Sequence, residues 1–335
     1  MTSRWTTSNI PDQTGKTIIV TGANSGLGEA TTNALATHGA RVILACRDTD
    51  KGAAAAKKMN GDVTVRELDV ADLDSVRSFA DQTGQVDVLI NNAGVMATPE
   101  QRTSDGFELQ LGTNYLGHFA LTGLLLPHIT ERVVMVSSLA HIIGRIDYDD
   151  PNWRTRSYRR WPAYGQSKLA DLMFSYELHR RLQASGSTLR SIAVHPGLAR
   201  TALHTHTDSV QSGLIAALTS VGQNSARGAL PSLFAATAPD AASGHYYGPS
   251  GPGEIRGYPR PAFSTPASRN VQAAAALWDL SETLTDVHFL TPIPAGTESV
   301  PVGGAATGRE KASWLTAGAV LGAAVLTVAL RRSRR

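Results

Sequence analysis

Tyr164 and Lys168 lie four residues apart in the run Ala-Tyr-Gly-Gln-Ser-Lys. On a helix, side chains at this spacing project from the same face, so the phenol and the ammonium group would be neighbours. The positive charge of the lysine then favours the phenolate. A free tyrosine titrates near about 10, too high for ready proton exchange at neutral pH. The pair therefore predicts a phenol tuned to give a proton to a substrate or take one from it.

A glycine-rich stretch far upstream, Thr21 to Gly28, follows an apolar run and opens a helix-like segment. In that context, backbone N–H groups and the helix N-terminus can hold a pyrophosphate, as dinucleotide cofactors require. Three residues separate the first two glycines and one precedes the third, which differs from the G-x-G-x-x-G form. The predicted contacts of this loop are Gly22, Asn24, Ser25, Gly26, Leu27 and Gly28.

Apolar, strand-like runs alternate with helix-like segments along most of the chain. Strands of a parallel sheet covered on both faces read as continuous apolar runs, and right-handed crossovers join them into a doubly wound sheet. The predicted fold is therefore a single α/β domain of Rossmann type. The expected strands are Thr17–Thr21, Arg41–Cys46, Val63–Glu67, Val86–Ile90, Val133–Ser137 and Ser191–His195. The expected helices are Gly26–His38, Thr49–Met59, Leu73–Thr83, Phe107–Pro127 and Ala163–Gln183.

The chain divides into a polar leader (1–15), the Rossmann domain (16–290), a flexible linker (291–312) and an apolar helix with a basic end (313–335). Within the domain, Thr201–Gln223 and the Gly- and Pro-dense Tyr246–Pro266 are either lid or pocket segments or ordinary surface excursions. Ligands bind beyond the carboxyl ends of parallel strands, which makes both segments candidates for the first interpretation. For Tyr246–Pro266, the two interpretations stand equal.

The segment Trp314–Leu330 contains no charged residue and is followed by four arginines within five residues. Its 17 residues would extend about 25 Å as a helix, slightly short of the roughly 30 Å hydrocarbon core. It is either a membrane anchor or a helix packed on this or another subunit. The positive-inside rule opposes an anchor that keeps the domain in the cytoplasm.

Composition narrows the partners and the compartment. The net charge is only +3, and much of the excess lies in the terminal arginines, so nothing predicts a nucleic-acid surface. Cys46 is the single cysteine, which excludes an intrachain disulfide and a cysteine-based metal site. His141 and His195 lie beside active-site motifs without a cluster of other ligands, so no metal is predicted. The leader lacks an apolar signal segment, and the catalytic domain is expected in the cytoplasm.

Several further motifs accompany the tyrosine and the lysine, and with them the chain resembles a classical short-chain dehydrogenase/reductase over about Lys16 to Leu284. These motifs are Asn91-Asn92-Ala93-Gly94, Asn114, Ser137-Ser138 and Pro196-Gly197 with Thr201. Within that family the chain is most similar to the retinol dehydrogenase-like branch. The phrases that carry this similarity are Leu44–Asp48, Ser137–His141 and Tyr246–Gly251.

The resemblance implies hydride transfer between a nicotinamide and a carbonyl or alcohol. A carbonyl that accepts hydride develops negative charge on oxygen and needs a donor and an acid. Ser138 would be the donor, with Ser137 as the competing serine, and Tyr164 the acid. Lys168 would support Tyr164 and the cofactor ribose, and Asn114 would hold a water that links Lys168 to solvent. The remaining cofactor contacts implied are Asp69, Val70, Asn91, Ala93, Gly94, Pro196, Gly197 and Thr201.

The residue that ends the second strand selects the cofactor. A carboxylate there binds the ribose 2′-OH of NAD, whereas a basic side chain accepts the 2′-phosphate of NADP. Arg47 follows Cys46, and the nearest carboxylate, Asp48, comes one residue later. The sequence therefore predicts NADP(H).

The expected activity is an NADP(H)-dependent oxidoreductase for a lipophilic substrate such as a retinoid, steroid or long-chain aldehyde. The family resemblance implies a homo-oligomer, whereas a C-terminal anchor would also suit a monomer. One alternative is a catalytically silent NADP-binding sensor or scaffold. Another is a protochlorophyllide reductase, which would need a pocket cysteine, whereas Cys46 ends a strand. The aromatic and arginine-rich segment Trp153–Trp161 either rims the substrate entrance or is a solvated basic loop.

Overall fold

One eight-stranded sheet organises the protein, in the order β3-β2-β1-β4-β5-β6-β7-β8. The computed structural model describes residues 4–198 and 223–290. Neighbouring strands are parallel except for the last pair, in which β8 runs antiparallel to β7. The strands are β1 (Thr17–Thr21), β2 (Arg41–Cys46), β3 (Asp62–Glu67), β4 (Val86–Asn91), β5 (Ile129–Val136), β6 (Arg190–Val194), β7 (Tyr246–Pro249) and β8 (Pro259–Pro261).

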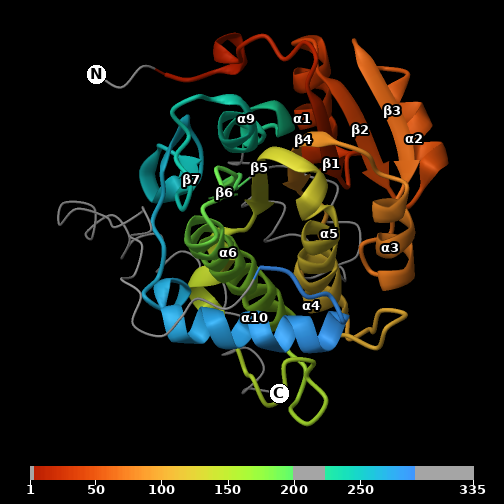
Figure 1. Cartoon of the computed structure of the whole chain (residues 1–335). Helices are drawn as coiled ribbons and strands as arrows, with labels where there is room; N and C mark the ends of the chain where they lie inside the picture. Colours follow the sequence, from red (N-terminus) through yellow and green to blue (C-terminus); the bar gives the residue numbers. More distant parts are fainter. Residues whose placement is uncertain (1–3, 199–222, 291–335) are drawn as a thin grey trace, which may run out of the picture.

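Helices cover both faces of the sheet (Figure 1). The α-helices are α1 (Gly26–Thr37), α2 (Thr49–Ala56), α3 (Leu73–Asp81), α4 (Leu109–Leu111), α5 (Gly117–Leu125), α6 (Arg160–Ala184), α8 (Ser225–Gly228), α9 (Leu230–Thr237) and α10 (Val271–Thr285). A π-helix, η2 (Gly112–Leu116), joins α4 to α5. The short 3₁₀ segments are η1 (Thr7–Asn9), η3 (Leu126–His128), η4 (Leu139–Ile143), η6 (Pro252–Glu254) and η7 (Ala267–Arg269).

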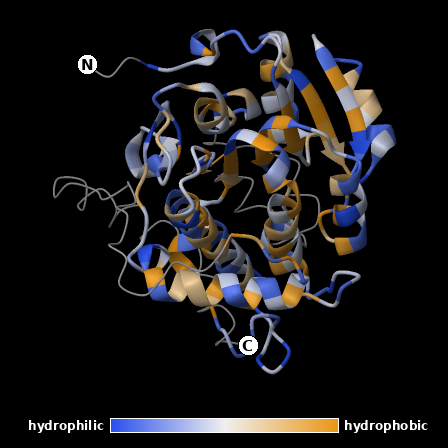
Figure 2. Cartoon of the chain, viewed as in Figure 1, coloured by the Kyte–Doolittle hydropathy of each residue, from blue (hydrophilic) through white to orange (hydrophobic). Residues whose placement is uncertain are grey.

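Each central strand contributes to two apolar layers, because successive side chains point to opposite faces. On β1, Ile18 and Val20 pack with α1 and α9, whereas Ile19 packs with α3, α5, α6 and α10. All three are fully buried. Figure 2 shows hydrophobic residues concentrated along these inner strands. This double burial explains why the strands read as unbroken apolar runs.

The predicted fold class is confirmed, and the expected strands differ from the observed ones by a few residues. The largest difference is β5, which begins at Ile129 rather than Val133, because Ile129 pairs with Val86 across a register shift between Val86 and Val88. The Gly- and Pro-dense segment contains two strands that were not expected. Tyr246–Pro249 is buried throughout and pairs with β6, and the more exposed Pro259–Pro261 pairs with β7. For Tyr246–Pro249, the interpretation as a surface excursion is wrong.

Two predicted segments cannot be compared with the structure. Residues 201–222 of the proposed lid and the apolar segment 314–330 lie outside the described residues. Among residues 4–198 and 223–290, no helix combines the length and the apolar character needed to cross a bilayer. The leader is in contact with the domain, since the ring of Trp5 meets Phe234 of α9 edge-on at 5.5 Å.

The order in which successive strands are added to the sheet reverses between β1 and β4. From β1 the chain proceeds outward to β2 and β3, then returns to β4 on the other side of β1. In open α/β sheets, ligands bind at such a switch point, outside the carboxyl ends of the strands. The loops after β1, β4, β5 and β6 are therefore the place to look for a site.

Candidate active site

The glycine-rich loop after β1 and the turn after β4 form one hydrogen-bonded unit. The hydroxyl of Thr21 accepts from the backbone N–H groups of Asn92 and Ala93, each at 2.9 Å. In return, Nδ2 of Asn92 donates to the carbonyl of Thr21 at 2.7 Å. The two predicted cofactor loops are thus fixed to each other at the switch point.

The conformation of this loop suits a phosphate group. Gly22 and Gly26 adopt positive φ angles of 63° and 59°, which glycine alone adopts at little cost. A Cβ atom on Gly28 would meet the carbonyl oxygen of Gly22 and would lie 2.7 Å from Nδ2 of Asn92. Ser25 is the N-cap residue of α1, yet its hydroxyl makes no capping hydrogen bond. The first turn of α1 thus offers N–H groups and a hydroxyl to an anion, and the residues present fit a dinucleotide pyrophosphate.

Tyr164 and Lys168 lie near the start of α6, as predicted. The Nζ atom of Lys168 is 6.0 Å from the ring centroid of Tyr164. Both residues are largely buried, with 8% and 6% of their surface exposed. The ammonium donates to the carbonyl of Val136 at 2.9 Å and to Oδ2 of Asp171 at 2.8 Å.

The two serines after β5 have different partners. The hydroxyl of Ser137 is buried and donates its proton to the carbonyl of Lys168 at 2.7 Å. Ser138 is the N-cap of η4 and accepts from the backbone N–H of Ala140 at 3.2 Å. An accepting hydroxyl keeps its own proton for another acceptor. This difference favours Ser138 over Ser137 as the donor to a substrate.

Asn114 lies in the π-helix η2, and its side chain ties the loop after β4 to α6. Its Oδ1 accepts from the N–H of Val95 at 2.7 Å. Its Nδ2 donates to the carbonyl of Val95 at 3.0 Å and to the hydroxyl of Ser167 at 2.8 Å. A Cβ on Gly94 would lie 3.0 Å from Oδ1 of Asn114 and 3.8 Å from Nζ of Lys168, so the backbone approaches both closely. The water relay through Asn114 stays a prediction.

The ring of His118 links the π-helix η2 to the end of β1. One ring nitrogen bonds the carbonyl of Asn114 at 2.8 Å, and the other bonds the hydroxyl of Thr21 at 2.9 Å. Burial lowers the pKa of His118 to about 4, so the ring is neutral at physiological pH. The spacing of four residues between Asn114 and His118 is the one signal from which this bridge could be predicted.

After β2, where the sequence predicts the adenosine part of the cofactor, the Arg47 side chain is 78% exposed, with Nη1 3.7 Å from Oδ2 of Asp69. Oδ1 of Asp69 accepts from the N–H of Ala71 at 2.9 Å, while Val70 is buried. The Asn91 amide donates to the hydroxyl of Thr122 in α5 at 2.9 Å, so this side chain ties the end of β4 to α5.

The loop after β6 is held by a buried histidine and a buried glutamate. Gly197, at a φ of 67°, donates its N–H to Nδ1 of His195 at 3.2 Å. Because Nδ1 accepts, Nε2 carries the proton and donates to Oε2 of Glu254 at 2.9 Å. The carbonyl of Pro196 accepts from Nε2 of Gln223 at 2.8 Å. Thr201 lies outside the described residues.

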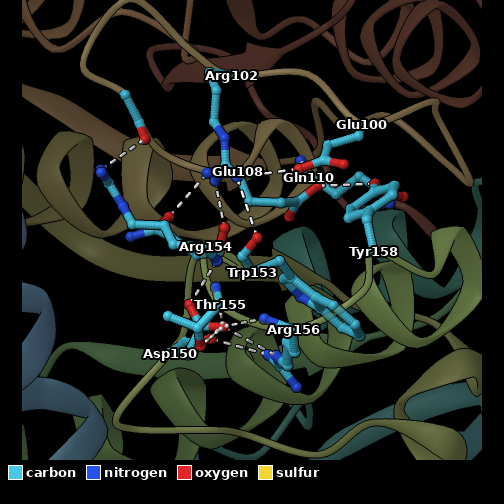
Figure 3. A network of polar contacts seen from close by, with 12 residues as sticks. Glu100, Arg102, Glu108, Gln110, Asp150, Trp153, Arg154, Thr155, Arg156 and Tyr158 are labelled. Atoms are coloured by element: carbon cyan, nitrogen blue, oxygen red, sulfur yellow. Dashed lines mark hydrogen bonds and ion pairs between the residues drawn. The ribbon is translucent and has the colours of Figure 1, made fainter.

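The segment before α6 is packed and hydrogen-bonded rather than simply solvated (Figure 3). Asp150 accepts from the N–H groups of Arg154, Thr155 and Arg156. Trp153 is only 5% exposed, and the guanidinium of Arg156 stacks on its ring at 3.7 Å. Of the two interpretations of this segment, the solvated loop is wrong for Trp153, although Arg154 remains exposed.

Tyr158 anchors the same segment to α4. Its hydroxyl donates to Oε1 of the buried Glu108 at 3.0 Å and accepts from Nε2 of Gln110 at 2.8 Å (Figure 3). Gln110 also donates to the carbonyl of Arg160 at 3.0 Å and accepts from the N–H of Ala97 at 2.7 Å. The first turn of α6 is thereby fixed to the loop after β4.

Residues 16–211 match the family model described as short chain dehydrogenase. The chain belongs to the short-chain dehydrogenase family. Among solved structures, this short-chain dehydrogenase is similar to an uncharacterized protein from Mycobacterium Paratuberculosis, with 49% identity and a TM-score of 0.76 over 86% of this chain and 100% of that one. A short chain dehydrogenase from Burkholderia cenocepacia J2315 in complex with NADP shares the fold, at 22% identity and a TM-score of 0.54 over 69% and 93% of the two chains.

Curated relatives confirm the resemblance to the retinol dehydrogenase branch. Human Retinol dehydrogenase 13 is 52% identical over 206 residues, which are 58% of this chain and 62% of that protein. The chain therefore matches less than two thirds of the length of that relative. Human Retinol dehydrogenase 12 is 41% identical over 291 residues, or 82% of this chain and 88% of that protein.

Proposed function

We propose that this protein is an NADP(H)-dependent oxidoreductase that interconverts the carbonyl and alcohol forms of a lipophilic substrate. The observation that carries the proposal is the position of Lys168. Its Nζ atom lies 6.0 Å from the ring centroid of Tyr164 and 3.8 Å from where a Cβ on Gly94, in the loop after β4, would lie. Ser138, after the end of β5, is the proposed third member of the site. Family membership supports the same chemistry.

In the reductive direction, bound nicotinamide supplies the hydride. The Ser138 hydroxyl donates a hydrogen bond to the substrate oxygen, where negative charge develops. The phenol of Tyr164 gives its proton to that oxygen, and the positive charge of Lys168 stabilises the phenolate that remains. In the oxidative direction, the phenolate takes the proton from the alcohol.

A lipophilic substrate is supported by two observations. The ring of Trp161 meets that of Tyr164 nearly edge-on, with centroids 6.2 Å apart, which places an aromatic surface beside the reacting phenol. Two of the curated relatives, at 52% and 41% identity, are named for retinol, an apolar alcohol. A protochlorophyllide reductase would need a cysteine in its substrate pocket. Cys46 is instead buried at the end of β2, where its thiol donates to the carbonyl of Asp48, so this alternative is not favoured.

The preference for NADP is proposed to come from Arg47. We expect Arg47→Ala to weaken NADPH binding roughly ten- to a hundredfold while NADH binding changes little, since a charge-assisted contact is typically worth about 1.5–3 kcal/mol. Fluorescence titration of both cofactors measures the two dissociation constants. Lys51→Ala is the matched control, because Lys51 is a similarly exposed cation that pairs with Asp48. Equal affinity for both cofactors, unchanged in the variant, would refute the assignment.

The function itself is tested by following NADPH oxidation by the full chain with a panel of retinoid, steroid and long-chain aldehydes or ketones, and the reverse reaction with the alcohols. Turnover of a lipophilic carbonyl with NADPH supports the proposal. Tight NADPH binding with no turnover of any compound would favour the sensor alternative. Fractionation of cells that express the full chain, or a chain ending at Gly308, tests whether the C-terminal segment attaches the enzyme to a membrane.

A further inference from the structure

The ammonium of Lys168 is engaged by a carboxylate one helical turn further along α6. Oδ2 of Asp171 lies 2.8 Å from Nζ of Lys168, and the two side chains are 0% and 7% exposed. The other oxygen of Asp171, Oδ1, is buried and has no hydrogen-bond partner. A carboxylate in such a place is costly unless a neighbouring cation compensates for its charge. Lys168 is that cation.

The titratable groups next to this pair, apart from Tyr164, are neutral. Tyr115 of η2 is buried, with its hydroxyl bonded to Ser281 of α10 at 2.7 Å, and burial raises its pKa, so it is neutral. His118 of α5 is also neutral at physiological pH. Tyr164 is the remaining titratable group that interacts with Lys168. Within the described part of the chain, Lys168 is the one ion-pair partner of Asp171.

On the basis of the proposed function, we propose that Asp171 is a positioning residue that acts as counter-ion to Lys168 and weakens the support that Lys168 gives to the phenolate of Tyr164. The physical reason is simple. An ammonium in contact with a carboxylate presents a dipole rather than a full positive charge to a phenol on its other side. In a buried site, little solvent screens this difference.

Protonation of Asp171 would remove the counter-ion. Burial raises the pKa of Asp171 to about 6, against the opposing effect of Lys168. Burial disfavours the charged form of Lys168, but the contact with Asp171 outweighs it and leaves the pKa of Lys168 above its ordinary value. Above about pH 6, Asp171 is therefore charged and Lys168 is partly neutralised. Asp171→Asn should reproduce the state that the parent protein reaches below about pH 6, over the pH range in which the buried Lys168, without the contact that raises its pKa, keeps its proton.

The test is a pH titration of the Tyr164 phenol in the full chain without cofactor. The tyrosinate absorbance of the protein is compared with that of its Tyr164→Phe counterpart, so that the other tyrosines cancel in the difference. We expect Tyr164 to ionise about one pH unit lower in Asp171→Asn than in the parent protein. Asp171→Ala, which removes the charge with a different shape, should shift the ionisation in the same direction and serves if the first variant does not fold.

Two controls separate the charge from a structural role. Asp279→Asn removes an exposed carboxylate of α10 that lies 3.7 Å from Arg181 of α6. This variant should leave the ionisation of Tyr164 unchanged. In a Lys168→Met background, Asp171 loses the cation that lowers its pKa, so burial favours its neutral form and Asp171→Asn should have little effect. An unchanged or higher ionisation pH in folded Asp171→Asn, or an equal shift in the Lys168→Met background, would overturn the inference. Because the titration needs no turnover, missing activity would count against the proposed function and not against this inference.

Discussion

Replacement of Tyr164 by phenylalanine is expected to lower turnover by about a thousandfold or more, while the dissociation constant for NADPH changes by no more than a few-fold. General acid–base catalysis by one positioned side chain typically contributes about 10²–10⁴-fold, and the phenol is the group proposed for that task. Phenylalanine keeps the ring that packs against Trp161. The loss should therefore be chemical rather than structural. Steady-state kinetics with the best substrate of the panel, together with fluorescence titration of NADPH, measures both quantities.

Tyr176→Phe is the matched control for this experiment. Tyr176 is a fully buried tyrosine on the same helix, three turns beyond Tyr164, so its replacement removes an equivalent hydroxyl from α6. Turnover of this variant should stay within a few-fold of the parent. If Tyr164→Phe kept most of the activity, the acid would have to be another group, and the proposed mechanism would be wrong.

The part of the site that the sequence predicted is the part built from local patterns. Tyr164 and Lys168 share a face of α6 because helical geometry alone brings residues four apart together. Likewise, Gly22 and Gly28 follow β1 directly, so their place at the carboxyl edge of the sheet follows from the apolar run before them. The spacing of Lys168 and Asp171 is also local, and a closer look at ion pairs three residues apart could have indicated their contact.

The rest depends on contacts between distant segments, for which a single sequence carries little signal. Tyr246–Pro249 reads as a Gly- and Pro-containing loop, yet it is a strand because β6 offers an edge for it to pair with. The segment before α6 reads as a basic surface loop, but Tyr158 bonds Glu108 fifty residues earlier. A buried polar partner of this kind becomes visible only when the fold places both groups together.

Glu254→Ala should lower the free energy of unfolding by about 3–5 kcal/mol, because one buried and one partly buried donor lose their acceptor, and hydrogen bonds to a charged group are typically worth about 1.5–3 kcal/mol each. The carboxylate accepts from Nε2 of His195 at 2.9 Å and from the N–H of Phe263 at 3.0 Å. Both His195 and Glu254 are almost fully buried. The free energy of unfolding from chemical denaturation measures the loss.

Two further variants determine whether the buried carboxylate itself is responsible. Glu254→Gln should lie between the parent and the alanine variant, because an amide presents one oxygen where two donors need an acceptor. Glu100→Ala removes a half-exposed carboxylate that pairs with Arg102 at 3.3 Å, and should cost less than about 1 kcal/mol, as exposed ion pairs do. A loss below about 1 kcal/mol for Glu254→Ala would mean that water replaces the carboxylate. The loop at Gly197, which is predicted to face the nicotinamide and whose N–H depends on the same histidine, would then need another support.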